Sequence, residues 1–119
     1  MHPVLQQAYE KEMTEAVAQY NAGDLQLAFF QLERAHILGQ SCPVEHARAH
    51  WWMLKVGWRR RDFLEITGQI PRILGALLFS RIWVPIGNPG GARVPPFQSM
   101  PVPEEFRSIL KQYGRDSET

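Results

Sequence analysis

Apolar residues recur every three or four positions from the N-terminus to about residue 80, and this spacing predicts helices rather than strands. Four long helices are expected there, over about 3–21, 25–38, 43–61 and 63–79. A fifth, short helix is expected over about 103–113, because that segment opens with proline and two acidic residues and is followed by glycine. The pattern therefore predicts an all-α protein.

Residues that favour helix ends separate the four long segments. Asp24 and Asp62 are good N-caps, because a carboxylate oxygen accepts hydrogen bonds from the free amides of the first turn. Gly39 is expected to end the second helix, since glycine adopts the left-handed conformation at little cost. Ser41 or Cys42 is expected to cap the third helix, just before a proline in its first turn. Connections this short predict that successive helices fold back on one another.

The two halves of this helical region resemble each other. Asp24 and Asp62 lie 38 positions apart, and the same offset aligns Leu32 with Ile70. Each half is predicted to be a helical hairpin whose second helix begins at an aspartate. The first half, with alanines at positions 16, 28 and 35, resembles a tetratricopeptide repeat. The expected architecture is therefore two stacked helical hairpins similar to tetratricopeptide repeats.

The third predicted helix carries three of the four tryptophans. Its expected core-facing stripe consists of four residues at helical spacing: Ala47, Trp51, Leu54 and Trp58. Trp52 and Trp83 are less constrained and are candidates for a groove or a dimer interface. The arginines at 59–61 lie where positive charge complements the helix dipole, so we interpret them as a solvated helix end.

A change in composition divides the chain. Of the nineteen residues 85–103, six are proline and three are glycine, so no continuous helix or central strand is expected to cross them. We predict a single domain over 1–119, because that length suffices for one modest core. Within it we expect a helical body (1–84), a Pro/Gly-rich loop that wraps the body (85–102), and a short helix with a tail (103–119).

Charge and cysteine content exclude several classes of protein. Thirteen Lys and Arg residues against twelve Asp and Glu leave a net charge of +1, which argues against a nucleic-acid partner. The single cysteine excludes an internal disulfide. The most apolar stretch, 70–86, is interrupted by Arg72 and Arg81, so no transmembrane segment is expected. A cytoplasmic location with a reduced thiol at Cys42 is the expectation.

Three of the four histidines lie within fifteen residues. His46 and His50 are four apart, which places both imidazoles on one face of a helix. His36 becomes level with them if the second and third helices pack antiparallel. Three converging imidazoles suit zinc, copper or nickel. We therefore predict a metal site at these histidines, with four candidates for an additional ligand: Cys42, Glu33, Glu45 and Glu65.

Other interpretations of these residues stay open. Two histidines one turn apart are often an ordinary, partly buried polar edge of a helix. No serine lies in a nucleophile-elbow motif, and Cys42 has no identifiable third partner, so an enzyme is the less favoured interpretation. His46 or His50 could still act as a general base beside an open metal position. A helical interaction module or homodimer that binds no metal is the main alternative.

Several motifs taken together resemble a small bacterial family of unknown function. They are Glu33–Gln40, His46-x3-His50-Trp51-x-Met53, Gly68-Gln69-x2-Arg72, Gly87-Asn88-x-Gly90-Gly91-Ala92 and Met100–Pro103. The resemblance implies a bacterial source and genes often near heavy-metal-resistance genes, but no particular activity. It favours a metal-binding accessory protein for heavy-metal handling over the alternatives.

Overall fold

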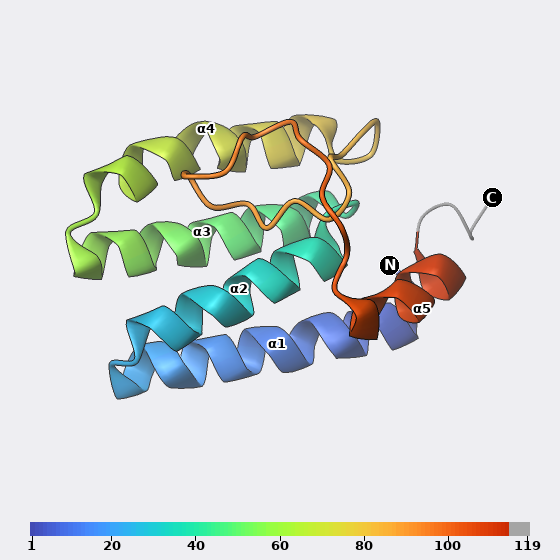
Figure 1. Ribbon diagram of the computed structural model, residues 1–119, viewed down its shortest axis with the longest axis horizontal. Coiled ribbons are helices and arrows are strands. Elements are labelled where there is room, and N and C mark those ends of the chain that lie inside the picture. The colour runs from blue at the N-terminus through green and yellow to red at the C-terminus, as the bar shows by residue number, and fades with distance from the viewer. Residues whose placement is uncertain (115–119) are drawn as a thin grey trace.

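The computed structural model describes residues 1–114, which form five α-helices and no strand. Helices α1 to α4 lie side by side in chain order, and each packs on the next (Figure 1). Their bounds are Pro3–Ala22 for α1, Leu25–Gly39 for α2, Pro43–Arg60 for α3, Phe63–Phe79 for α4 and Glu104–Tyr113 for α5. The predicted all-α fold with helices in adjacent pairs is thereby confirmed.

The predicted aspartate caps begin α2 and α4. Asp24 Oδ1 accepts a hydrogen bond from the Leu27 amide at 3.1 Å, and Asp62 Oδ1 accepts one from the Glu65 amide at 3.3 Å. Cys42 occupies the N-cap position of α3, but its side chain makes no capping hydrogen bond. The proline in the first turn of α3 removes one free amide there, so the helix needs this cap less.

Helix α2 ends at Gly39, as predicted, but without the expected left-handed glycine. Helix α2 includes Gly39 and is followed by Gln40 in right-handed helical conformation. The glycine is needed for packing instead, because a Cβ at this position would lie 2.8 Å from the Tyr9 ring. The Tyr9 hydroxyl donates to the Glu45 carbonyl at 2.8 Å, which holds α1 against the first turn of α3.

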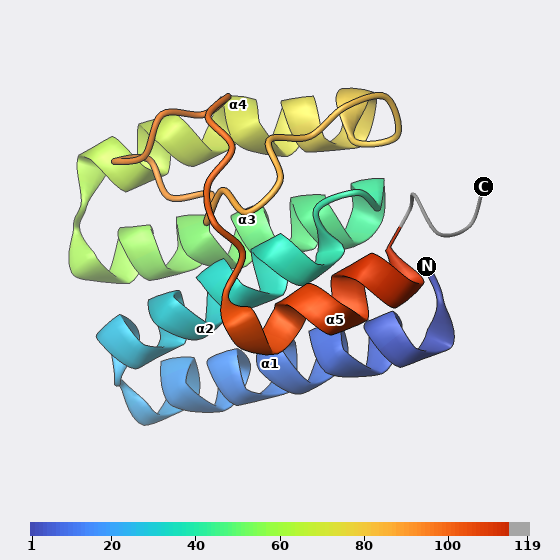
Figure 2. The ribbon, with the colours of Figure 1, turned by 45° about the vertical axis from the view of Figure 1, so that its right-hand side comes forward.

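The hydrophobic core lies between α1, α2 and α3, and α5 closes it. Figure 2 shows α5 lying along α1, where Phe106 enters the core. The core contains five large apolar residues from α1 and α2, three alanines that allow close helix packing, and two residues of α3. They are Leu5, Tyr9, Met13, Ala16, Ala28, Leu32, Ala35, Leu38, Met53 and Val56. This packing fixes the α2–α3 pair that carries the histidines.

The predicted tryptophan stripe of α3 is wrong. Trp51 is 49% exposed and Trp58 is 71% exposed. Because α3 is packed by α2 on one side and α4 on the other, its buried positions hold smaller or polar residues, namely His46, Ala47, Ala49, His50, Met53, Val56 and Gly57. Trp52 packs edge-on against Tyr20 with ring centroids 5.3 Å apart, and only Trp83 of the two unassigned tryptophans is largely exposed.

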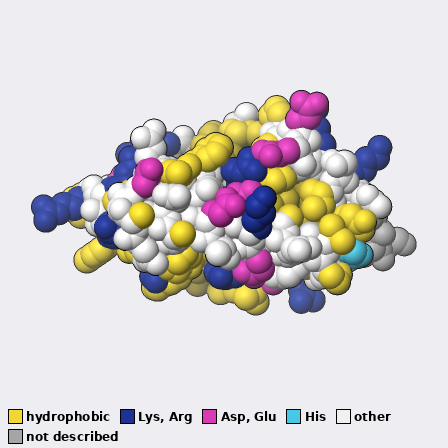
Figure 3. Space-filling view, turned by 90° about the horizontal axis from the view of Figure 1, so that it is seen from below, with side chains coloured by type: hydrophobic (Ala, Val, Ile, Leu, Met, Phe, Trp, Pro, Cys, Tyr) yellow, Lys and Arg dark blue, Asp and Glu magenta, His cyan; other side chains and the backbone are white. Residues whose placement is uncertain are grey.

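Helix α4 turns polar residues inward and apolar residues outward. Its buried residues are Glu65, Gln69 and Ala76. We call its exposed apolar residues the outer face of α4: Phe63, Leu64, Ile70, Leu74, Leu77, Leu78 and Phe79. The side of the molecule that carries α1 instead mixes both charges with apolar residues (Figure 3). Within residues 1–114, no helix combines the length and apolar character that crossing a bilayer requires.

The segment between α4 and α5, residues 80–103, runs back along α4 and α3 before descending to α5 (Figure 1). Gln40, Gln69 and Arg72 donate side-chain hydrogen bonds to its carbonyl oxygens at 2.8, 3.0 and 3.1 Å. In return, the Ala92 amide donates to the Glu65 carboxylate at 3.0 Å. Side chains of the helices therefore hold this Pro/Gly-rich segment beside the histidines.

Candidate metal centre

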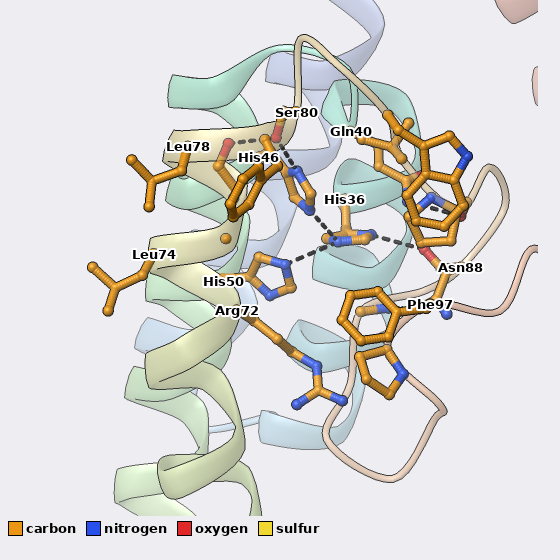
Figure 4. Close-up of a pocket in the computed structure, with 18 of the residues that line it drawn as sticks. His36, Gln40, His46, His50, Arg72, Leu74, Leu78, Ser80, Asn88 and Phe97 are labelled. Atoms are coloured by element: carbon orange, nitrogen blue, oxygen red, sulfur yellow. Dashed lines mark hydrogen bonds between the residues drawn. The ribbon is translucent and has the colours of Figure 1, made fainter.

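Three imidazoles meet where α2 and α3 pack together. His36 comes from the last turn of α2, and His46 and His50 come from successive turns of α3. The Nε2 atom of His36 lies 2.8 Å from Nε2 of His46 and 3.1 Å from Nε2 of His50 (Figure 4). One nitrogen from each ring lies within 4.8 Å of the other two, and all three residues are buried. The fold thus brings together the three histidines that the sequence singled out.

The opposite nitrogens of two rings are held by acceptors. His36 Nδ1 lies 2.8 Å from the carbonyl oxygen of Asn88, and a carbonyl only accepts, so Nδ1 carries the proton. His50 Nδ1 lies 2.6 Å from Gln69 Oε1. The Gln69 amide nitrogen donates to Glu65 at 2.9 Å, which fixes the amide orientation and leaves Oε1 as the acceptor. His50 Nδ1 is therefore a donor as well.

The third ring is held by a hydroxyl. His46 Nδ1 lies 2.7 Å from Ser80 Oγ. The Ser80 hydroxyl donates its proton to the Ala76 carbonyl, one turn earlier in α4, so its oxygen accepts from the imidazole. All three Nδ1 atoms are thus protonated donors. In the neutral rings, every Nε2 then presents a lone pair to the centre of the cluster.

Burial keeps these imidazoles neutral. Desolvation lowers the pKa of His46 to about 3 and of His50 to about 4, and it lowers the pKa of His36 well below its ordinary value. A positive charge on His50 would also repel one on His36 or on His46, which lowers the pKa of both rings further. At pH 7 the centre therefore holds three deprotonated nitrogens, the form in which imidazole binds a metal.

A cavity of about 630 Å³ opens in front of the three rings. Its other walls are mainly apolar and include Leu74, Leu78, Phe79, Trp83 and Phe97. Among the described residues that line it, Arg72 is the only one with a formal charge. Figure 4 shows the Arg72 guanidinium below His50, on the same side of the cavity as Phe97.

The four additional ligand candidates lie outside the histidine group. Among residues 1–114, the group with metal-binding spacing contains neither Cys42 nor Glu33, Glu45 or Glu65. Glu65 contributes indirectly. Its carboxylate accepts a hydrogen bond from the Gln69 amide and so orients Gln69, which is the hydrogen-bond acceptor of His50. Burial, reinforced by the negative charge of Glu65, raises the pKa of Glu33 to about 7.

Sequence reasoning missed the residues that orient the imidazoles. Gln69 and Asn88 lie inside motifs that carry the family resemblance, which is the only signal in the sequence that points to them. Ser80 stands in no motif. Gly90 has a φ of +90°, and a Cβ there would lie 2.7 Å from the His36 ring, so only glycine lets residues 80–103 cover that imidazole.

The fold and the site define a small all-α protein with a buried three-histidine cluster beside a Pro/Gly-rich segment. The chain belongs to the family described as "Protein of unknown function (DUF3703)", whose family model matches residues 3–110. Comparison with curated proteins and with solved structures gives no match. The predicted membership of a family of unknown function is confirmed, and the neighbourhood of heavy-metal-resistance genes stays a prediction.

Proposed function

We propose that this protein binds one transition-metal ion, zinc, copper or nickel, through the Nε2 atoms of His36, His46 and His50. One observation carries the proposal: three Nε2 lone pairs converge at 2.8 and 3.1 Å while every Nδ1 proton is engaged elsewhere. A tetrahedral zinc ion with bonds of about 2.0–2.1 Å sets neighbouring ligand nitrogens about 3.3 Å apart. The distances from His36 to His46 and to His50 are close to that requirement, and all three nitrogens lie within 4.8 Å of one another.

The hydrogen bonds that the three Nδ1 atoms make favour a metal site over an ordinary polar core. A histidine that ligates a metal donates its other N–H to a carbonyl, carboxylate or similar acceptor, which fixes the tautomer and raises ligand basicity. Here a carbonyl, an amide oxygen and a hydroxyl fill that role. Without a cation, three buried acceptors would face one another with no donor between them, which costs free energy.

We propose an accessory role in metal handling rather than catalysis. Three histidines leave a fourth coordination position, which suits delivery and release of an ion as well as activation of water. Beyond the histidines, the cavity offers no carboxylate among the described residues to serve as a general base. A reducing cytoplasm, in which Cys42 stays a thiol, is the compartment we propose.

Metal titration tests the proposal. Purified protein is titrated with zinc, nickel and copper(I) by calorimetry or with a competing chelator. We expect one equivalent bound per chain, and loss of that binding in the His46→Ala/His50→Ala double variant. The His2→Ala variant is the matched control, because His2 caps α1 and lies outside the cluster. Absence of stoichiometric binding, or equal binding by the double variant, would refute the metal site.

The outer face of α4 supports a second candidate function, a homodimer. Leu78 is 68% exposed and Phe63 is 71% exposed, which is unusual for a protein surface. Seven such residues at roughly 100 Å² each expose on the order of 700 Å², near the ~800 Å² per partner of a standard interface. We expect light scattering to report a dimer that persists with chelator, and a monomer for Phe63→Glu, since Phe63 does not line the cavity. A wild-type monomer would refute this candidate.

A further inference from the structure

The cavity beside the histidines has the dimensions of a small-molecule site. Its volume of about 630 Å³ lies within the ~300–1,000 Å³ range of ligand pockets. All three histidines line it, so a metal held by them would take its fourth ligand from the cavity. The remaining walls are contributed mainly by the second half of α4 and by residues 82–97. A molecule that reaches the metal must therefore fit between apolar side chains.

The positive charge in this cavity is only partly compensated, because the carboxylate of Glu65 acts on Arg72 but does not line the cavity. Imidazole ligands are neutral, so a divalent ion would keep its two positive charges. Arg72 adds a third, and no acidic side chain is among the described residues of the lining. Concentrated positive charge away from bulk water is costly unless an anion accompanies it. The site thus favours a ligand that carries a negatively charged group.

Hydrogen bonds hold the Arg72 guanidinium in a position to bind such a group. Its Nη1 donates to the Gly68 carbonyl at 2.8 Å and its Nη2 donates to the Val94 carbonyl at 3.1 Å. A guanidinium has five N–H donors, so further donors remain for a ligand. None of the ion pairs within residues 1–114 involves Arg72. Its positive charge is close enough to contribute to the lowered pKa of His50, after the larger effect of burial.

We propose that this cavity binds an amphiphilic monoanion, a carboxylate on a compact apolar body. The carboxylate would bind the metal and pair with Arg72, and the body would pack against Leu74, Trp83 and Phe97. The inference rests on the proposed metal site. It goes beyond that site because it assigns a ligand class and gives Arg72 a binding role.

Cobalt(II) is the probe, because its visible spectrum reports both metal binding and exchange of the fourth ligand. The cobalt-loaded protein is titrated with 3-phenylpropionate, with acetate and with 3-phenylpropan-1-ol. We expect saturable spectral change with 3-phenylpropionate. Acetate lacks the apolar body and the alcohol lacks the charge, so each is expected to bind at least about tenfold more weakly.

Two arginine variants complete the experiment. Arg72→Gln is expected to weaken 3-phenylpropionate at least about tenfold while the protein still binds one cobalt ion, and Arg72→Lys is expected to restore part of the loss. Arg81→Gln is the matched control, because Arg81 is exposed and does not line the cavity. Cobalt binding without any response to 3-phenylpropionate, or equal binding of acetate, overturns this inference and leaves the metal site intact. Failure to bind cobalt overturns both.

Discussion

At the scale of single residues, each imidazole of the cluster donates to a different kind of acceptor. His36 uses a backbone carbonyl, His50 uses the Gln69 amide and His46 uses the Ser80 hydroxyl. Only the last two acceptors can be removed by substitution without moving the backbone. The orientation of His50 and that of His46 can therefore be tested separately.

Gln69→Leu removes the acceptor of His50 and leaves all three proposed ligands in place. We expect metal affinity to fall about 10–100-fold, because loss of an outer partner frees the ring and its tautomer. Competition with a chromophoric chelator measures the change. Gln98→Leu makes the same substitution at an exposed position and is expected to leave affinity unchanged. Equal affinities for the two variants would show that Gln69 does not orient the site.

Glu33 makes stability depend on pH. Burial raises its pKa from 4.5 to about 7 in the folded protein, so the folded state binds more protons than the unfolded state between these values. The contribution of Glu33 to stability therefore falls as pH rises from about 4.5 to 7 and is level above that. We expect Glu33→Gln to be more stable than wild type at pH 8. The difference should vanish near pH 4.5, as thermal unfolding at both pH values would reveal.

At the scale of elements, local signals predicted the helices, and long-range contacts decided which faces they bury. Asp24 and Asp62 marked two helix starts because an N-cap depends on the next three residues alone. Trp51 was wrongly assigned to the core because hydrophobic spacing cannot reveal that α4 covers the other side of α3. The convergence of His46 and His50 follows from helix geometry. Ser80 and Asn88 could not be predicted, since their contacts depend on the path of residues 80–103.

Gly90 allows the path of residues 80–103 to be tested, with Gly75 of α4 as its control. Gly90→Ala places a Cβ 2.7 Å from the His36 ring at a φ of +90°, so we expect a loss of about 1–3 kcal/mol in stability and weaker metal binding. Gly75→Ala is the control within α4, where a Cβ meets nothing within 4 Å. That change is expected to stabilise the helix by about 0.5–1 kcal/mol. Chemical denaturation would measure both, and a Gly90→Ala protein as stable as wild type would contradict the close packing.

At the scale of the whole molecule, the histidine cluster links the three-helix core to α4 and to residues 80–103. The main core lies between α1, α2 and α3, whereas the cluster also reaches α4 through Gln69 and residues 80–103 through Asn88. An ion at the centre would therefore stabilise the contact between these parts as well as the site. Its effect should be visible in global unfolding.

Removal of metal should lower the melting temperature. Free ion at about 100 times Kd stabilises the folded state by about 2.7 kcal/mol, which for a chain of this size corresponds to roughly 10 °C. Scanning calorimetry with zinc and then with excess chelator would record the shift. In the His46→Ala/His50→Ala variant, the melting temperature should be the same under both conditions. A wild-type protein equally indifferent to chelator would contradict the coupling of metal to fold.

The spacing of the site along the chain has a practical consequence for transplanting it. All three proposed ligands fit within residues 36–50, a length that a synthetic helix–turn–helix peptide could supply. Their hydrogen-bond acceptors, however, come from positions 69, 80 and 88. A grafted peptide would carry the ligands but lose the control of their tautomers. A search for related centres in other proteins should therefore require these distant acceptors along with the histidine spacing.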